Sequence, residues 1–246
     1  MNKRIIPLVA LAAAGIAGSG APAKAALMLS ADVSGVVFSC VDQAACDNNP
    51  NIGQLGLGTA GAPLVVNGVD VFGSLHIAQG IPGNPGSNFL SSSSLQVVNT
   101  SGAARTLTLA VGATDFTGPV SGFSTAGSGT FLSTVGSTIA LRYFIDAANG
   151  QGGENPNDTP GTSVTPFDFT ATNNPDAFSH QGAGGISIAN PYSMTLQSFF
   201  TLDGDGRLIS RGQSIVTNVP EPVSLAIFGT ALVGLGFAAR TRRSRI

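Results

Sequence analysis

The stretch that decides the fold is Tyr192-Ser-Met-Thr-Leu-Gln-Ser-Phe-Phe-Thr-Leu202, followed by Asp203-Gly-Asp-Gly206 and Arg207-Leu-Ile-Ser-Arg-Gly-Gln-Ser-Ile-Val216. Its first part alternates, with Met194, Leu196, Phe200 and Leu202 on one side. A period of two predicts a β-strand with one buried face. The glycines and aspartates that follow predict a tight turn, and the chain from Leu208 to Val216 predicts a returning strand. We therefore expect a terminal hairpin.

The same pattern recurs upstream, with Gly, Asn and Pro between the segments. Asn67-Gly68 favours a tight hairpin turn, because these residues accept positive φ angles. Two neighbouring segments, Leu95–Asn99 and Arg105–Gly112, predict a meander around a turn at 100–104. The other expected strands are 27–33, 36–38, 63–72, 139–145, 167–172 and 185–189, and the expected loops are 78–94 and 146–165.

These short strands without intervening helices predict an all-β fold. We find no convincing helix before Glu221 and no fixed repeat period, so a β-solenoid is disfavoured. The expected fold is a single antiparallel β-sandwich or jelly-roll-like domain over residues 26–218.

Charge is scarce and predominantly acidic in this domain. Charged residues make up 10% of the chain, compared with about 25% in ordinary domains. Residues 26–218 contain every acidic residue of the chain except Glu221, and their basic residues are Arg105, Arg142, Arg207 and Arg211. Nucleic acid is therefore disfavoured as a partner, because binding phosphates requires a basic surface.

The N-terminus has the three parts of a secretory signal peptide. Lys3 and Arg4 precede an apolar segment, 5–17, and the small residues 21–25 suit signal peptidase. The expected cleavage lies between Ala25 and Ala26, with cleavage after Ala23 as the fallback. Residues 1–25 are thus predicted to be a signal peptide; a retained membrane helix is the less favoured alternative.

The C-terminus contains an apolar segment followed by a basic cluster. Residues 223–239 carry no charge, and a helix of that length would be about 26 Å long, near the short end of what a bilayer core of about 30 Å requires. The arginines that follow favour a cytoplasmic end, which places the domain across the inner membrane. A buried core helix is the alternative, but such a helix seldom lacks a polar face. The cluster consists of Arg240, Arg242, Arg243 and Arg245.

The whole of this tail, 219–246, resembles the PEP-CTERM sorting signal of Gram-negative bacteria. The resemblance is carried by Val219, Pro220, Glu221 and Pro222, by Ser224-Leu225, by the glycine-spaced apolar segment and by the terminal arginines. It implies recognition by an exosortase, a membrane enzyme similar to transpeptidases, with removal of the tail near Glu221. It also implies delivery to the cell surface or matrix of bacteria that make exopolysaccharide. A permanent single-span anchor is the alternative fate of the tail.

Cys40 and Cys46 are the only cysteines of the chain. An isolated pair this close in an exported protein predicts a disulfide. A metal site with Asp42 or Asp47 is the alternative, but His76 and His180 are both distant in sequence.

Other motifs give only weak signals for chemistry. A Gly-x-Gly-x-x-Gly match at 56–61 is followed by Pro63 and a hairpin rather than a helix, which disfavours a nucleotide site. The aspartates at 203–206 lack the distal Glu of a calcium loop. Asp146, Glu154 and Asp158 could bind calcium or act as a glycosidase pair, but the domain has a single Glu and no Trp. His76 and His180 lack a serine motif to activate.

Taken together, the sequence predicts a non-enzymatic exported protein of the cell surface or extracellular matrix, associated with exopolysaccharide or biofilm. The alternative is a surface module that binds carbohydrate or calcium, and an extracellular hydrolase is less favoured. We predict no catalytic residues, no metal ligands and no cofactor. The expected partners are an exosortase-like membrane enzyme, the inner membrane and exopolysaccharide.

Overall fold

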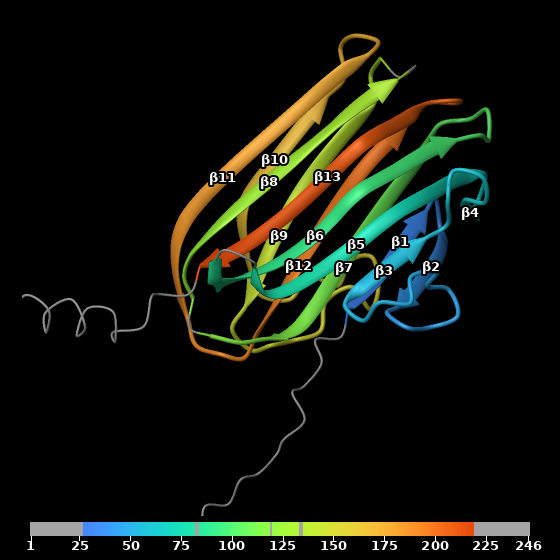
Figure 1. Cartoon of the computed structure of the whole chain (residues 1–246). Helices are drawn as coiled ribbons and strands as arrows, with labels where there is room; N and C mark the ends of the chain where they lie inside the picture. Colours follow the sequence, from blue (N-terminus) through green and yellow to red (C-terminus); the bar gives the residue numbers. More distant parts are fainter. Residues whose placement is uncertain (1–26, 82–83, 119, 133–134, 219–246) are drawn as a thin grey trace, which may run out of the picture.

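The computed structural model of the 246-residue chain describes residues 27–81, 84–118, 120–132 and 135–218. These residues form two antiparallel β-sheets packed face to face (Figure 1). The strands are β1 (Leu27–Val33), β2 (Val36–Val41), β3 (Gln54–Leu57), β4 (Leu64–Val66), β5 (Val69–Ile81), β6 (Asn84–Asn99), β7 (Arg105–Phe116), β8 (Val120–Leu132), β9 (Thr138–Asp146), β10 (Thr162–Thr170), β11 (Asp176–Ile188), β12 (Tyr192–Leu202) and β13 (Arg207–Asn218).

The strand order identifies a nested arrangement. The six-stranded sheet runs β10-β9-β12-β7-β1-β2, and the seven-stranded sheet runs β11-β8-β13-β6-β5-β3, with β4 paired to β5. The pairs β6:β13, β7:β12, β8:β11 and β9:β10 alternate between the two sheets, an order typical of a jelly roll. The predicted antiparallel two-sheet sandwich is therefore confirmed.

The core lies between the sheets and follows the predicted alternation. Leu27 and Leu29 of β1, Leu196 of β12 and Ile145 of β9 are almost completely buried. Asn67 and Gly68 turn the chain between β4 and β5 with φ angles of 47° and 75°, as the Asn-Gly pair predicted.

Two expected hairpins are wrong, for the same reason. β12 pairs with β7 and β9, whereas β13 pairs with β6 and β8, so the tight turn at 203–206 connects the two sheets. Likewise β6 and β7 belong to different sheets, and no meander forms around 100–104. In each case both strands bury apolar side chains, and they do so by facing each other across the core.

Residues 78–94 were expected to be a loop, and this too is wrong. They lie mainly in β5 and β6, the longest neighbouring pair of strands. Their polar residues fit the interior because it contains polar partners: Asn88 donates to the hydroxyl of Tyr192 at 2.7 Å, and Tyr192 also hydrogen-bonds Thr217. Ser92 accepts a bond from Arg211 at 3.0 Å.

Arg211 is the largest polar side chain in the core. β-Bulges in β13 and β6 interrupt the register on either side of it, and its guanidinium lies wholly buried between the sheets. It donates to Ser92, to Ser198 and to the side-chain oxygen of Gln213. Burial lowers the pKa of Arg211 from 12.5 to about 10. Among the described residues it has no carboxylate partner, because the one ion pair joins Arg142 and Asp168.

Candidate binding groove on the six-stranded sheet

Two rows of side chains cross the outer face of the six-stranded sheet. The first row is made entirely of threonines, since Thr106, Thr201, Thr138 and Thr170 lie opposite one another on β7, β12, β9 and β10. The second row is displaced by two residues along each strand. It consists of Thr108, Phe199, Ala140 and Asp168 on the same four strands. Strands lie about 4.8 Å apart, so each row extends for about 14 Å.

A groove of ≈ 510 Å³ follows these rows. Phe199 projects into it from the central strand β12 and is 36% exposed. Its neighbour Ala140 has a short side chain, which leaves the hollow between the phenyl ring and Asp168. An exposed aromatic ring beside hydroxyl groups provides both an apolar surface and hydrogen-bonding partners.

An ion pair borders one side of the groove. Arg142 donates to Asp168 at 2.7 Å and to the backbone carbonyls of Leu141 and Phe167, each at 3.0 Å. These three acceptors fix the guanidinium in one position. The side chain of Asp168 remains 71% exposed, so its carboxylate can accept further hydrogen bonds. The pair also balances the charges at this border.

The groove ends where residues 147–161, here called the strap, cross the same face. The amide of Gln197 donates to the Pro156 carbonyl at 2.8 Å. The strap passes so close to β7 that a Cβ atom on Gly112 would lie 1.9 Å from the carbonyl oxygen of Gly152. Glycine at position 112 therefore permits the contact. The predicted loop at 146–165 thus exists in shortened form and lies flat on the sheet.

Two of the three loop carboxylates considered as calcium ligands or glycosidase acids, Asp146 and Asp158, instead accept backbone amides within turns. Asp146 accepts the backbone amides of Ala148 and Gly150 at 3.1 and 2.8 Å. Asp158 accepts the backbone amide of Glu154 at 3.4 Å. Within the described ranges, no three or more His, Cys, Asp or Glu residues gather as a metal site would require.

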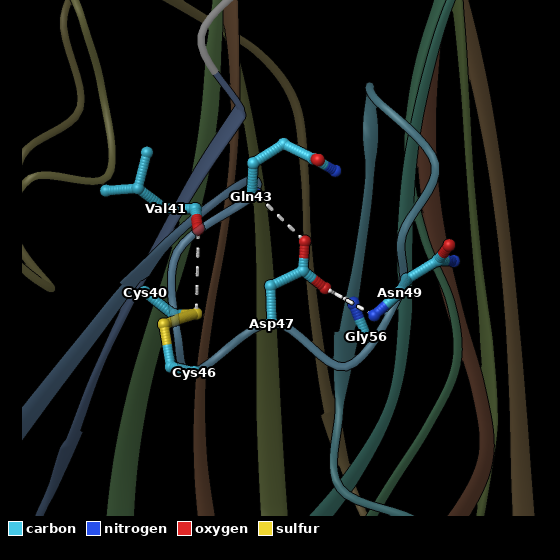
Figure 2. The surroundings of a disulfide bond; sticks show 7 residues. All are labelled: Cys40, Val41, Gln43, Cys46, Asp47, Asn49 and Gly56. Carbon is cyan, nitrogen blue, oxygen red and sulfur yellow. Dashed lines mark hydrogen bonds between the residues drawn. A yellow bond between two sulfur atoms is a disulfide. The ribbon is translucent and has the colours of Figure 1, made fainter.

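The disulfide between Cys40 and Cys46 is confirmed, with the two Cα atoms 5.9 Å apart. The turn that it closes is organised by Asp47, whose carboxylate accepts the amides of Gln43, Asn49 and Gly56 at 2.8 to 3.0 Å (Figure 2). These bonds orient Asp47 as an acceptor for the backbone.

The two histidines lie apart. His76, on β5, hydrogen-bonds the hydroxyl of Ser74 at 3.1 Å. His180 lies on β11, with its ring centroid 4.7 Å from that of Phe167. Its Nε2 atom lies 3.1 Å from the backbone oxygen of Thr165, which helps to close this border of the sandwich.

Several predicted sites lie outside the described residues. These are the cleavage site at Ala25 and Ala26, the sorting motif Val219, Pro220, Glu221 and Pro222, and the cluster Arg240, Arg242, Arg243 and Arg245. In the part of the chain that the structure describes, no helix is both long enough and apolar enough to span a bilayer.

The groove itself was not predicted from the sequence. Alternation in 192–202 already places Phe199 on the face opposite to Leu196, and Thr106 and Thr108 likewise alternate with Leu107. The sequence does not indicate that β7, β12, β9 and β10 are neighbours, because their pairing spans long separations.

No protein-family model matches the chain, and no curated protein matches it in sequence. Distant matches occur among solved structures. The carbohydrate-binding module TmCBM61, solved with β-1,4-galactotriose, is 12% identical over 69% of this chain and 90% of its own, with a TM-score of 0.34. The C-terminal CBM6 of the laminarinase LamC from Zobellia galactanivorans is 13% identical over 67% and 99%, with a TM-score of 0.22. The VP2 protein of infectious bursal disease virus is 13% identical over 79% and 54%, with a TM-score of 0.31. TM-scores this low do not establish a shared site.

Proposed function

We propose that residues 26–218 form an exported, non-catalytic domain that binds a neutral polysaccharide along the groove on the six-stranded sheet. The observation that carries this proposal is the position of Phe199, exposed at the centre of two rows of side chains that are rich in hydroxyl groups. The phenyl ring provides an apolar face for the C–H surface of a sugar ring, while the threonine hydroxyls provide donors and acceptors for its hydroxyl groups.

The charges of the groove favour a neutral ligand. Asp168 is the only charged residue that lines it among the described residues, and Arg142 balances that charge at 2.7 Å. An anionic polysaccharide would gain no unpaired cation here and would approach a domain with an acidic excess.

The same residues favour binding without hydrolysis. Glycosidases generally use two opposed carboxyl groups across the scissile bond. Asp168 is the one carboxyl group among the described lining residues, and it already accepts a hydrogen bond from Arg142 at 2.7 Å. Phe199 and the threonines offer neither a base nor an acid for the reaction.

The sequence at the two ends supports a place of action outside the inner membrane. In this proposal the signal peptide directs export, and an exosortase-like enzyme recognises residues 219–222 and releases the domain to the cell surface or matrix. The disulfide Cys40–Cys46 is consistent with an oxidising compartment. The domain would there contact the exopolysaccharide of its host.

Affinity electrophoresis of the purified protein tests the binding proposal. Native gels containing a dextran, a galactan, a β-glucan or the host exopolysaccharide should retard the protein in at least one case. Phe199→Ala should weaken that retardation by about tenfold or more, since a buried aromatic contact contributes about 1.5 kcal/mol or more. The matched control is Val65→Ala, which removes a side chain that is 61% exposed on β4, in the other sheet.

Phe199→Tyr should retain binding, because its ring keeps the apolar face. If none of these polysaccharides retards the protein, or if Phe199→Ala binds as well as Val65→Ala does, the groove is not a polysaccharide site.

The sorting proposal has a separate test. The intact mass of the protein from its native host should show a mature extracellular species that ends near 220–222. A membrane-bound species that still ends at Ile246, found alone, would identify the tail as an anchor and contradict processing.

A further inference from the structure

Five strands form the borders of the sandwich, and four of them have features that hinder pairing with another chain. In the six-stranded sheet, β10 contains a register shift between Val164 and Phe167, Pro166 and the charged Asp168. In the seven-stranded sheet, β11 has a register shift between Gly185 and Ile188. At the other border of this sheet, β3 and β4 both pair with β5 and are only four and three residues long. Bulges, prolines, charges and short length are the usual means of protecting an edge strand.

β2 differs from the other borders. It pairs with β1 in unbroken register, and its sequence Val-Val-Phe-Ser-Cys-Val contains no charge and no proline. It lies at one border of the sandwich, at the right in Figure 1. Val36, Val37 and Val41 are 47%, 60% and 38% exposed, three of the most exposed large apolar side chains among the described residues.

The backbone pattern identifies which groups of β2 are available. The amide of Asp42 donates to the Leu27 carbonyl at 2.9 Å, and hydrogen-bonded residues alternate along an antiparallel ladder. Phe38 and Cys40 therefore bond to β1. The N–H and C=O groups of Val37 and Ser39 lie in the plane of the sheet and point outward from its border. The Val41 carbonyl accepts the Ala44 amide at 3.0 Å, so the free ladder ends at Val41.

We propose that β2 pairs with β2 of a second copy of this chain, antiparallel and around a two-fold axis at Ser39. In this register Ser39 lies opposite Ser39 of the second copy, and Val37 lies opposite Val41. Val37 and Val41 thereby each gain an apolar cross-strand neighbour, and no like charges oppose each other.

The sequence of β2 is self-complementary, which favours a second copy of this chain as its partner. A two-fold interface requires that the same strand suit both sides, and closed two-fold dimers are the commonest soluble assemblies. The segment 37–41 meets this requirement, because reversing it again places valine opposite valine and serine opposite serine.

Pairing would also orient the two grooves. The two-fold axis of an antiparallel strand pair is perpendicular to the sheet, so both copies would present the outer faces of their six-stranded sheets on the same side. If the groove binds polysaccharide as proposed above, the dimer would engage one polymer at two places and gain avidity. The pairing of β2 does not depend on that function.

Hydrogen exchange and mass measurement together test the pairing. The full chain should sediment as a dimer, and the amides of Val37 and Ser39 should become protected as its concentration rises. Those of Phe38 and Cys40 should be protected at every concentration, because they bond within the chain. Val37→Lys and Ser39→Pro should each weaken dimerisation by about tenfold or more. The lysine would place a charged side chain opposite Val41 of the second copy, and the proline would remove a backbone donor from the ladder.

Val65→Lys is the control, because it charges an exposed valine of the other sheet and keeps the same termini. It should remain a dimer. The pairing is refuted if the wild-type protein is monomeric, if Val37→Lys dimerises as strongly as Val65→Lys, or if the amides of Val37 and Ser39 exchange freely in the wild-type dimer. Sedimentation of the chain with a different protein bound at β2, in place of a second copy, would also contradict the proposed pairing.

Discussion

Replacing Arg211 with methionine should stabilise the sandwich, although it removes three hydrogen bonds from the core. The guanidinium is fully buried and, among the described residues, its partners are neutral groups of Ser92, Ser198 and Gln213. A buried charge without a counter-ion incurs a desolvation cost that neutral hydrogen bonds only partly offset. Methionine fills a similar volume and adapts to irregular space.

The size of the effect follows from the pKa. Burial lowers the pKa of Arg211 from 12.5 to about 10, which corresponds to a cost of roughly 3 kcal/mol for the charged form at about 1.4 kcal/mol per unit. The substitution leaves the side-chain oxygen of Gln213 without its donor, at a cost of about 1–2 kcal/mol. The serine hydroxyls can rotate toward other acceptors. The net expectation is a gain of about 1 kcal/mol in the free energy of unfolding.

The gain should be measured near neutral pH. Because the folded pKa lies below the unfolded value, the folded and unfolded chains both carry the charge below about pH 10, and the full cost is present there. The cost fades only as the pH rises from about 10 toward 12.5, where the folded state has lost the proton that the unfolded state retains.

Urea unfolding followed by circular dichroism gives the comparison, with Arg211→Lys as the control. Lysine keeps the charge but not the forked donors, so this variant should lose about 2 kcal/mol or more. The reasoning is refuted if Arg211→Met is destabilised to the same extent as Arg211→Lys. The hydrogen bonds would then outweigh the desolvation of the charge.

Three further outcomes are expected. Gly112→Ala should lower the melting temperature and speed proteolysis within 147–161, because its Cβ would collide with the strap, whereas Gly61→Ala, which meets open space, should change neither. Asp176 accepts the amides of two residues in the preceding turn, which lowers its pKa, so its contribution is complete above the unfolded pKa of 3.8 and is lost as the pH falls through the lower folded value. The melting temperature of Asp176→Asn should accordingly fall below that of the wild type near neutral pH and converge with it in acid; an equal gap at all pH values would contradict this. Replacing Cys40 and Cys46 together by serine should cost about 2 kcal/mol of unfolding free energy under oxidising conditions and nothing against the reduced wild type.

Alternation was enough to predict individual strands but not their partners. The segments 27–33 and 139–145 were found because each has one apolar face, which a strand buries whichever strand lies beside it. The pairing of β12 with β7 joins residues that are far apart in sequence, and no local pattern encodes it. A tight turn such as 203–206 suits either a hairpin or a connection between sheets, so the turn could not decide between them.

The same limit explains why the groove was missed. Its floor combines the outward side chains of four strands, and Phe199 gains its threonine neighbours only through the order β7-β12-β9-β10. By contrast the disulfide was predictable, because Cys40 and Cys46 are close in sequence and need no knowledge of the sheets.

Polar residues in the core explain both why residues 78–94 were not predicted to be strands and why the strands pair in one register. Ser92 and Asn88 made 78–94 resemble a loop, yet they bond to Arg211 and Tyr192 from other strands. If a strand shifted its register, one buried leucine could take the place of another at modest cost in free energy. The shift would, however, separate Asn88 from Tyr192 and leave buried polar groups unpaired. These buried polar pairs therefore favour one register. The surface of the sandwich carries few charges that could specify the register instead. The residues that hide the strands from pattern analysis are thus among those that align them.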